Sequence, residues 1–248
     1  MSRTALDLQR TLQRIDGRGY PAYKDLRGSY RFDDFTLSLD HIQGDPFAAP
    51  TRVRVRLPMQ IAGFPQDTRS SHSRQIALRD FIARSFSTEC TTVRHPDFGS
   101  GKSGLIAMAR PGQEILERSS VIVTDEFVEA RFVVGLPARG RRVLGHRAAN
   151  ILCRSIPKIV GATLKYGHLD PERLQAHLDA AEDADTLRQA LPALGLIAFV
   201  ADGSHLPRRS GVDYRPLRDS QAVPFRTPES LRTEITLPHA GQDRKSVV

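Results

Sequence analysis

A glycine-rich stretch containing one lysine is the part of this sequence that could most directly hold a phosphate group. It reads HPDFGSGKSGLIAM from His95 to Met108 and contains the tripeptide Gly101-Lys102-Ser103. Nucleotide-binding P-loops end in Gly-Lys-Ser or Gly-Lys-Thr, because backbone N–H groups and the lysine hold the phosphates. A complete P-loop has another glycine five positions before the glycine of this tripeptide, but Pro96 occupies that place. The pattern is therefore incomplete.

The residues that follow the tripeptide also differ from those of a P-loop. In a P-loop the lysine opens a helix, whereas GLIAMARPG is interrupted by Pro111-Gly112 and favours a strand. We interpret the stretch as a glycine-rich turn between two strands. The alternative is a nest of N–H groups that, together with the lysine, binds an anion or a nucleotide phosphate. The residues that would make this contact are Gly99, Gly101, Lys102 and Ser103.

Two arginine-rich stretches offer further phosphate ligands. GLPARGRRVLG places Arg139, Arg141 and Arg142 just before a predicted helix, and guanidinium groups suit phosphate oxygens. A solvated loop whose arginines pair with nearby acids explains them equally well. Both interpretations stay open.

The second arginine-rich stretch, TRVRVRLP, has the alternation of a strand. It predicts that Arg52, Arg54 and Arg56 share one face while the valines between them share the other. Such a stripe could contact nucleic acid, although it could also be a solvated face, since no aromatic residue is interleaved to stack a base.

Composition limits the classes of protein that need to be considered. The 248 residues include 36 Lys and Arg against 28 Asp and Glu, so the net charge is +8 and the surface favours phosphates, nucleic acid or acidic partners. Two cysteines without a Cys-x-x-Cys pair indicate a reducing compartment, and we expect a cytoplasmic protein. The longest apolar run, residues 193–201, is too short to cross a membrane, so we predict no membrane association.

We identify no catalytic residue and no metal ligand from the sequence. None of the histidines has the spacing of a zinc site, and Gly-x-Ser-x-Gly is missing from the sequence. Apolar periodicity predicts helices near residues 6–15, 74–86 and 170–191, and strands at 30–42, 51–58, 91–93, 105–109, 120–123, 126–136, 196–200 and 230–238. Because these do not follow a regular βαβ rhythm, the predicted fold class is α+β.

Several longer motifs occur in an order that resembles one protein family. They include IDGRGYPAYKDLRGSY, HIQGDPFAAPTRVRVRLP, GSGKSGLI, PGQEILERSSVIV, VEARFVVGLPARGRRVLG, GLIAFVADGSHLPRRSGV and AVPFRTPESLRTEITLPH. Together they resemble the predicted ATPases of the ABC class from about Ile15 to His239. The resemblance implies a mixed N-terminal α+β domain over residues 1–165 and the incomplete beginning of an ABC-type P-loop nucleotide-binding domain over residues 166–242.

The resemblance also implies a function and partners. In the family the ATPase's own P-loop comes shortly after the segment matched by TEITLPH, so we expect this chain to stop before its Walker A loop. The full-length protein would bind and hydrolyse ATP with Mg²⁺, and this N-terminal fragment would not be catalytic. Its expected partners are the missing C-terminal ABC ATPase domain and, when full length, a second copy in a homodimer. The alternative is a nucleic-acid-binding module that uses a basic face.

The last six residues depart from the family pattern. Residues 243–248, DRKSVV, match the translation of a common sequencing adapter. We therefore expect a truncated gene and exclude these residues from reasoning about the fold.

Overall fold

The computed structural model describes residues 3–93 and 99–240, so Pro96 and the predicted adapter residues 243–248 lie outside the described part. The chain forms two compact units. The first unit comprises Met1–Gln66, Arg79–Arg110 and Glu117–Pro171, and the second comprises Asp67–Leu78, Pro111–Leu116 and Glu172–Val248. The predicted α+β class is confirmed, because helices accompany a mixed sheet.

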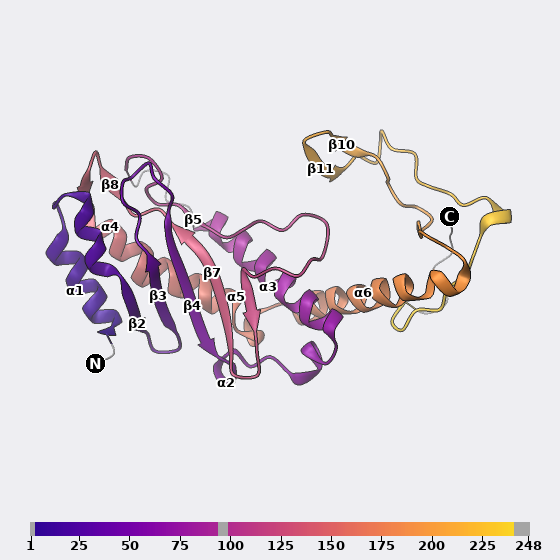
Figure 1. Ribbon diagram of the computed structural model, residues 1–248, viewed down its shortest axis with the longest axis horizontal. Helices are drawn as coiled ribbons and strands as arrows, with labels where there is room; N and C mark the ends of the chain where they lie inside the picture. Colours follow the sequence, from indigo (N-terminus) through magenta and orange to yellow (C-terminus); the bar gives the residue numbers. More distant parts are fainter. Residues whose placement is uncertain (1–2, 94–98, 241–248) are drawn as a thin grey trace. The chain divides into compact units, whose positions relative to one another are not determined.

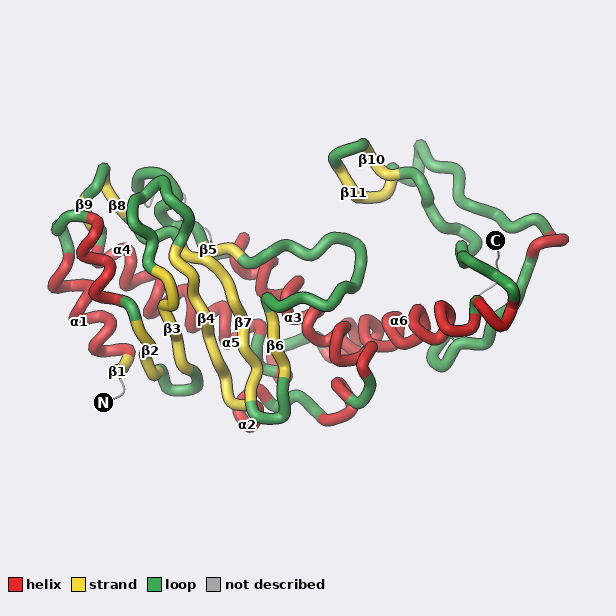
Figure 2. The backbone as a smooth tube through the Cα atoms, viewed as in Figure 1, coloured by secondary structure: helices red, strands yellow, loops and turns green. Residues whose placement is uncertain are grey.

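A seven-stranded sheet forms the centre of the first unit (Figure 2). Its strands are β1 (Arg3–Thr4), β2 (Gly28–Arg31), β3 (Thr36–His41), β4 (Thr51–Pro58), β5 (Ile106–Ala107), β6 (Val121–Val123) and β7 (Phe127–Val134). Their order is β1-β2-β3-β4-β7-β5, with β6 also beside β7, and only the β1–β2 pair is parallel. Because one face is buried and the other is polar, side chains alternate in and out along β4.

The predicted strand over residues 30–42 is in fact a hairpin. β2 and β3 are joined through Asp33 and Asp34, and the backbone N–H of Phe32 donates to the carbonyl of Phe35 at 2.8 Å. Two adjacent aspartates favour such a turn because their short polar side chains bond to nearby backbone groups.

Helices cover the apolar face of this sheet (Figure 1). They are α1 (Ala5–Ile15), α4 (Gly145–Asn150), a π-helical turn (Ile151–Ser155), α5 (Ile156–Thr163) and part of α3 (His72–Thr92). The chain also contains the short helix α2 (Met59–Ala62) and helical turns at Tyr20–Leu26, Gln66–Arg69 and Tyr166–His168. The rings of Phe86 on α3 and Phe132 on β7 lie 4.9 Å apart between these layers. Thr4 caps the N-terminus of α1: its hydroxyl accepts from the N–H of Asp7, and the Asp7 carboxylate accepts from the N–H of Thr4.

The predicted strand at residues 91–93 is wrong, because α3 continues through Thr92. β-branched residues usually favour strands, but the hydroxyls of Thr91 and Thr92 donate to carbonyls of the preceding turn at 2.7 and 2.9 Å. These bonds satisfy the hydroxyls within the helix.

The second unit contains one long helix and little sheet. α6 (Pro171–Ala190) confirms the predicted helix, and it is followed by a turn at Pro192–Leu194, the hairpin β10 (Arg208–Ser210) and β11 (Asp213–Pro216), and a turn at Glu229–Leu231. The predicted strands at 196–200 and 230–238 are wrong, since residues 196–200 form no strand and the second segment has only bridge positions, at residues 234 and 237. A strand requires a neighbour to pair with, and β10–β11 is the only sheet among the described residues of this unit. No helix in the described ranges is long and apolar enough to cross a membrane.

Candidate functional site

The glycine-rich stretch is a tightly held turn in the first unit, which we call the glycine loop (residues 99–104). Its backbone N–H groups donate to carbonyls of neighbouring segments: Ser100 to Ala138 at 2.7 Å, Lys102 to Pro46 at 2.9 Å and Gly104 to Gly135 at 2.9 Å. These amides already have acceptors inside the protein. An anion at this loop would therefore be held chiefly by side-chain charge.

Close backbone approach explains why this loop requires glycine. A Cβ atom at Gly99 would lie 2.0 Å from the carbonyl oxygen of Ala138, and one at Gly101 would lie 2.4 Å from that of Pro46. Both residues also have positive φ angles of 126° and 62°. On the neighbouring segment that follows β7, a Cβ atom at Gly135 would lie 1.7 Å from the carbonyl oxygen of Lys102. The glycines thus let three backbone segments pack together.

The loop is attached to the arginine-rich hairpin, residues 138–143, which contains β8 (Ala138–Arg139) and β9 (Arg142–Val143). The Ser103 hydroxyl accepts from the N–H of Ala138 at 3.0 Å, and the Ser100 hydroxyl accepts from the N–H of Gly140 at 2.9 Å. Buried tyrosines support the segment that leads into the hairpin, since Tyr20 and Tyr23 donate to the carbonyls of Leu136 and Pro137. The YPAY motif therefore positions this hairpin.

The structure brings the two predicted phosphate-contact groups into one cluster. Lys102, Arg139, Arg141 and Arg142 are all exposed there. Arg141 has 86% of its side chain exposed and lies 3.4 Å from Asp45, while Arg142 donates to the carbonyl of Gly17 at 3.2 Å. Their charges are thus exposed on two segments whose backbones adjoin.

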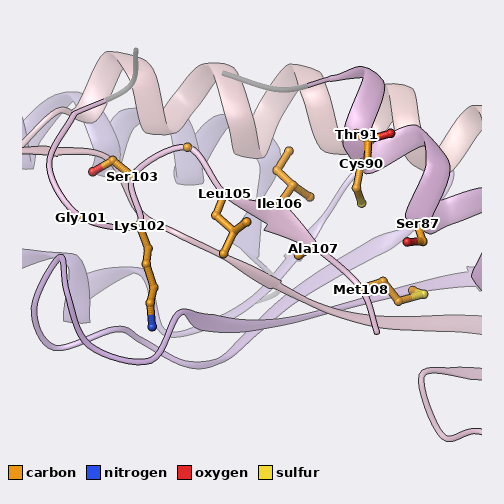
Figure 3. A pocket seen from close by; sticks show the side chains of 11 residues that line it. Ser87, Cys90, Thr91, Gly101, Lys102, Ser103, Leu105, Ile106, Ala107 and Met108 are labelled. Carbon is orange, nitrogen blue, oxygen red and sulfur yellow. The ribbon is translucent and has the colours of Figure 1, made fainter. Parts of the chain in front are cut away.

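A cavity of about 400 Å³ lies beside the glycine loop, lined by residues 101–108 and by Ser87, Cys90 and Thr91 of α3 (Figure 3). The Lys102 side chain extends away from Cys90 and Met108 in this view. Burial raises the pKa of Cys90 to about 12 and that of Cys153 to about 11. Neither thiol forms an appreciable amount of thiolate at neutral pH, so neither suits nucleophilic chemistry.

A second basic region covers the outer side of the sheet. The burial pattern of β4 confirms that Val53 and Val55 point into the core while the arginines between them point outward. Strand register places Arg31 of β2 and Arg131 of β7 in line with them. We call this surface the arginine face; it comprises Arg31, Arg52, Arg54, Arg56 and Arg131 together with Asp40 and Glu129.

Glu129 is the centre of the arginine face and is fully buried. Its carboxylate accepts from Arg56 at 2.7 Å and from Arg131 at 2.9 Å, and it lies 3.6 Å from Arg54. Arg54 also makes a bidentate contact with Asp40 at 3.0 and 3.1 Å, which raises the pKa of Arg54. Two carboxylates thus hold three of the five arginines, Arg54, Arg56 and Arg131, while leaving the face with a positive charge.

Residue type and spacing did not single out Glu129, because its contacts depend on pairing between β4 and β7. The register places Glu129 directly opposite Arg56, although the two are 73 positions apart in the chain. A groove of about 670 Å³ lies on another part of the arginine face and is lined by Asp40, Arg52, Arg54 and Arg131 among others.

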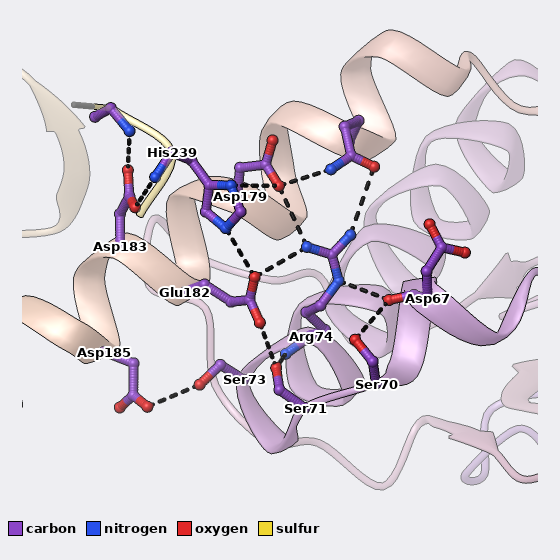
Figure 4. A network of polar contacts seen from close by, with 12 residues as sticks. Asp67, Ser70, Ser71, Ser73, Arg74, Asp179, Glu182, Asp183, Asp185 and His239 are labelled. Atoms are coloured by element: carbon purple, nitrogen blue, oxygen red, sulfur yellow. Dashed lines mark hydrogen bonds and ion pairs between the residues drawn. The ribbon is translucent and has the colours of Figure 1, made fainter. Parts of the chain in front are cut away.

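In the second unit, Arg74 organises a polar network (Figure 4). Its side chain is 7% exposed and donates to Glu182 at 2.9 Å, to Asp179 at 3.3 Å and to the carbonyl of Asp67 at 2.7 Å. His239 contacts the same Glu182 at 2.9 Å. The network thereby ties the first turn of α3 and the segment around residue 239 to α6.

One group of side chains in the described part of the chain has the spacing of a metal site. It consists of Asp179, Glu182 and His239, whose ligand atoms lie within 4.8 Å of one another. The guanidinium of Arg74 already supplies positive charge to both carboxylates. The arginine therefore takes the place that a cation would fill.

Comparison with known proteins identifies the family. Residues 5–167 match the family model for the N-terminal region of ATPases of the ABC class, and residues 170–244 match the model for its P-loop domain. No curated protein matches the chain. Gly-Lys-Ser occurs once in the sequence, at residues 101–103, which lies in the segment matched by the N-terminal model. The chain belongs to the family of ATPases of the ABC class.

Proposed function

We propose that this chain is the N-terminal part of an ATPase that, when full length, binds and hydrolyses ATP with Mg²⁺. The observation that carries the proposal is the pair of family models in the correct order along the chain. Phosphoryl transfer requires a lysine loop and a carboxylate that holds Mg²⁺. Because residues 170–244 contain no Gly-Lys-Ser or Gly-Lys-Thr, we infer that the 248-residue chain does not hydrolyse ATP by itself.

Reading the source gene beyond codon 242 tests this proposal directly. We expect a Gly-Lys-Ser or Gly-Lys-Thr loop within the next few dozen codons in the frame that continues the family pattern. The protein expressed from that gene should hydrolyse ATP, whereas the 248-residue chain should not. A gene with no such loop would contradict the proposal.

We further propose that the cluster of the glycine loop and the arginine-rich hairpin contacts the phosphates of a nucleotide held by the neighbouring ATPase domain. The support is the exposed positive charge of Lys102, Arg139, Arg141 and Arg142 on two adjoining segments. Lys102→Ala in the full-length protein should weaken ATP binding, since one charge-assisted contact is lost. Lys158→Ala, which removes an exposed lysine from α5, is the matched control. Unaltered ATP affinity in the Lys102 variant would exclude this contact.

The partner we propose for the second unit is the rest of the ABC ATPase domain, and a homodimer is the proposed state of the full-length protein. The support is the group of apolar side chains exposed on the second unit, which includes Ile197, Leu206, Val212 and Val223. Exposed apolar residues of this kind favour association with another surface. Aggregation that rises with the concentration of the 248-residue chain, and that disappears when the missing domain is restored, is the expected result.

A second candidate function is nucleic-acid binding by the arginine face. The specific observation in its favour is that one side of the sheet carries five outward-facing arginines and only two carboxylates, which hold three of them. Contacts between arginines and phosphates release counterions, so affinity should fall steeply as salt rises. Binding of single- and double-stranded RNA and DNA measured across a salt series tests this candidate, and no binding at low salt would remove it.

A further inference from the structure

One end of the arginine face carries an aromatic ring that the sequence alone did not place there. Strand register puts Phe127 of β7 opposite Pro58 of β4, and two positions further along it puts Glu129 opposite Arg56. Because side chains two apart on a strand share a face, Phe127 lies on the same outer surface as the arginines. The carbon at the centre of the Arg56 guanidinium is 4.0 Å from the centroid of the Phe127 ring.

This arginine is held over the ring by a buried carboxylate. Glu129 accepts from Nε of Arg56 at 2.9 Å and from Nη2 at 2.7 Å. The contact restrains the guanidinium, while 48% of the Arg56 side chain stays exposed. A planar cation restrained above an aromatic ring forms a surface on which another planar group can stack.

A cavity of about 410 Å³ opens beside this pair. Its size is within the range of small-molecule binding pockets, roughly 300–1,000 Å³. Besides Arg56 and Phe127, the residues lining it include Phe32 and Phe35, whose rings stack with centroids 4.7 Å apart. Asp33 and Glu126 are exposed at the cavity and offer oxygen atoms that accept hydrogen bonds.

We propose that this cavity, the base pocket, receives one unpaired nucleobase of a single strand whose phosphates lie along the arginine face. The proposal rests on the candidate nucleic-acid function above and adds the class of ligand. A base inside a duplex is stacked on both sides and cannot enter a pocket, so the ligand must be single-stranded or locally unpaired. Stacking on the Arg56–Phe127 pair would supply affinity, and the arginines nearby would neutralise the phosphates.

The carboxylates at the base pocket imply a preference among the bases. Asp33 and Glu126 can only accept hydrogen bonds, and cytosine and adenine carry exocyclic amino groups that donate them. Thymine and uracil have a carbonyl oxygen at the corresponding place, which these carboxylates would repel. The base pocket should therefore favour cytosine or adenine over thymine.

The experiment measures binding of the full 248-residue chain at low salt to four probes of equal length. They are single-stranded oligodeoxycytidine, oligothymidine, an abasic single strand with the same phosphates, and a duplex. Phe127→Leu keeps an apolar side chain without the ring, and Phe127→Tyr keeps the ring; the melting temperature of each variant shows whether it folds.

We expect oligodeoxycytidine to bind most tightly. Phe127→Leu should weaken its binding between about 5- and 150-fold, the range that stacking of one base supplies, while Phe127→Tyr should retain it. Neither substitution should change binding of the abasic strand. Equal affinity of the wild type for the base-bearing and abasic strands would overturn the base pocket but leave nucleic-acid binding intact. If no probe binds, the nucleic-acid function itself fails, and the base pocket fails with it.

Discussion

The two units of this chain are stabilised by different kinds of contact. In the first unit, large apolar side chains are fully buried between the helices and the sheet; examples are Leu12, Leu37, Val55 and Phe86. In the second unit, the described residues bury few large side chains, and a guanidinium with its carboxylates forms the most connected internal contact. The first unit therefore depends mainly on hydrophobic burial, whereas in the second unit a charged network also joins separate segments.

Exposed apolar residues show the same difference. Ile197, Val212 and Val223 in the second unit are 95%, 93% and 86% exposed. Side chains of this type are normally buried in a complete domain, where each contributes about 1.5–3 kcal/mol. The second unit therefore exposes apolar side chains that another surface could cover. This agrees with the proposal that the remainder of the ATPase domain packs there.

Removing the central arginine of the second unit should have the largest effect. Arg74→Ala would remove the guanidinium that Glu182 and Asp179 share, and we expect the free energy of unfolding to fall by about 3 kcal/mol. This value is at the low end for a buried pair, because these carboxylates keep 21% and 25% exposure. Hydrogen exchange should accelerate in α6 while the amides of β4 stay protected.

A surface arginine on α6 is the control for this first prediction. Arg188 pairs with Asp185 at 3.5 Å, but its side chain is 64% exposed. Arg188→Ala should therefore lower the free energy of unfolding by less than about 1 kcal/mol. Equal acceleration of exchange in both variants would show that Arg74 has no special role.

A glycine substitution in the first unit should have the next largest effect. In Gly135→Ala the new Cβ would lie 1.7 Å from the carbonyl oxygen of Lys102, so the glycine loop would have to move away. We expect the free energy of unfolding to fall by about 1–3 kcal/mol, as in other overpacked sites. Thermal unfolding measures this change.

Gly161→Ala on α5 is the matched control for the loop substitution. An added Cβ there would meet no atom within 4 Å apart from its chain neighbours and the backbone of its own helix, and the residue is helical. Alanine should raise the stability by about 0.5–1 kcal/mol, because it favours the helix more than glycine does. A Gly135 variant as stable as the Gly161 variant would contradict the close packing of the loop.

Local features of the fold could be predicted from the sequence, whereas pairing between distant segments could not. The alternation in TRVRVRLP correctly gave the two faces of β4, and apolar spacing correctly gave α1, α3 and α6. The strand predicted at 230–238 failed, since periodicity describes one segment and a strand also needs a partner. Local pattern is sufficient only where local contacts decide the structure.

The candidate sites show the same limit. The sequence singled out Lys102 and the arginines by residue type, but it could not show that Ser100 and Ser103 attach the glycine loop to the hairpin. It also could not place Phe127 beside Arg56, which are 71 positions apart, because only the register of β4 and β7 brings them together. The aromatic ring next to the arginines is therefore supplied by β7 and not by TRVRVRLP itself.

A helix cap in the first unit gives a smaller expected effect. Thr4→Ala removes the hydroxyl that accepts from the N–H of Asp7, so the free energy of unfolding should fall by about 1 kcal/mol. Thr4→Ser keeps that acceptor and should be nearly neutral. Chemical denaturation compares the two, and equal loss in both would indicate that the methyl group of Thr4, not its cap, stabilises α1.

Acidification should produce the smallest effect and should act on the second unit. Burial opposes ionisation of Glu182, but hydrogen bonds from Ser71, Arg74 and His239 outweigh it and lower the pKa of this carboxyl below its usual 4.5. Because the folded-state pKa is lower than the unfolded-state pKa, the carboxylate contributes stability that is fully present above pH 4.5. That stability is lost as the pH falls through the folded-state pKa.

The measurement is the rate at which pepsin, which works in acid, cleaves α6 and the segment near residue 239. Cleavage there should accelerate as the pH falls below 4.5, after correction for the enzyme's own pH profile on an unfolded substrate. Glu182→Gln removes the titrating group, so its cleavage should be faster at higher pH and should change less with acid. If the variant keeps the full acid dependence of the wild type, another carboxyl is responsible, and the charge network around Arg74 is not what acid disrupts in the second unit.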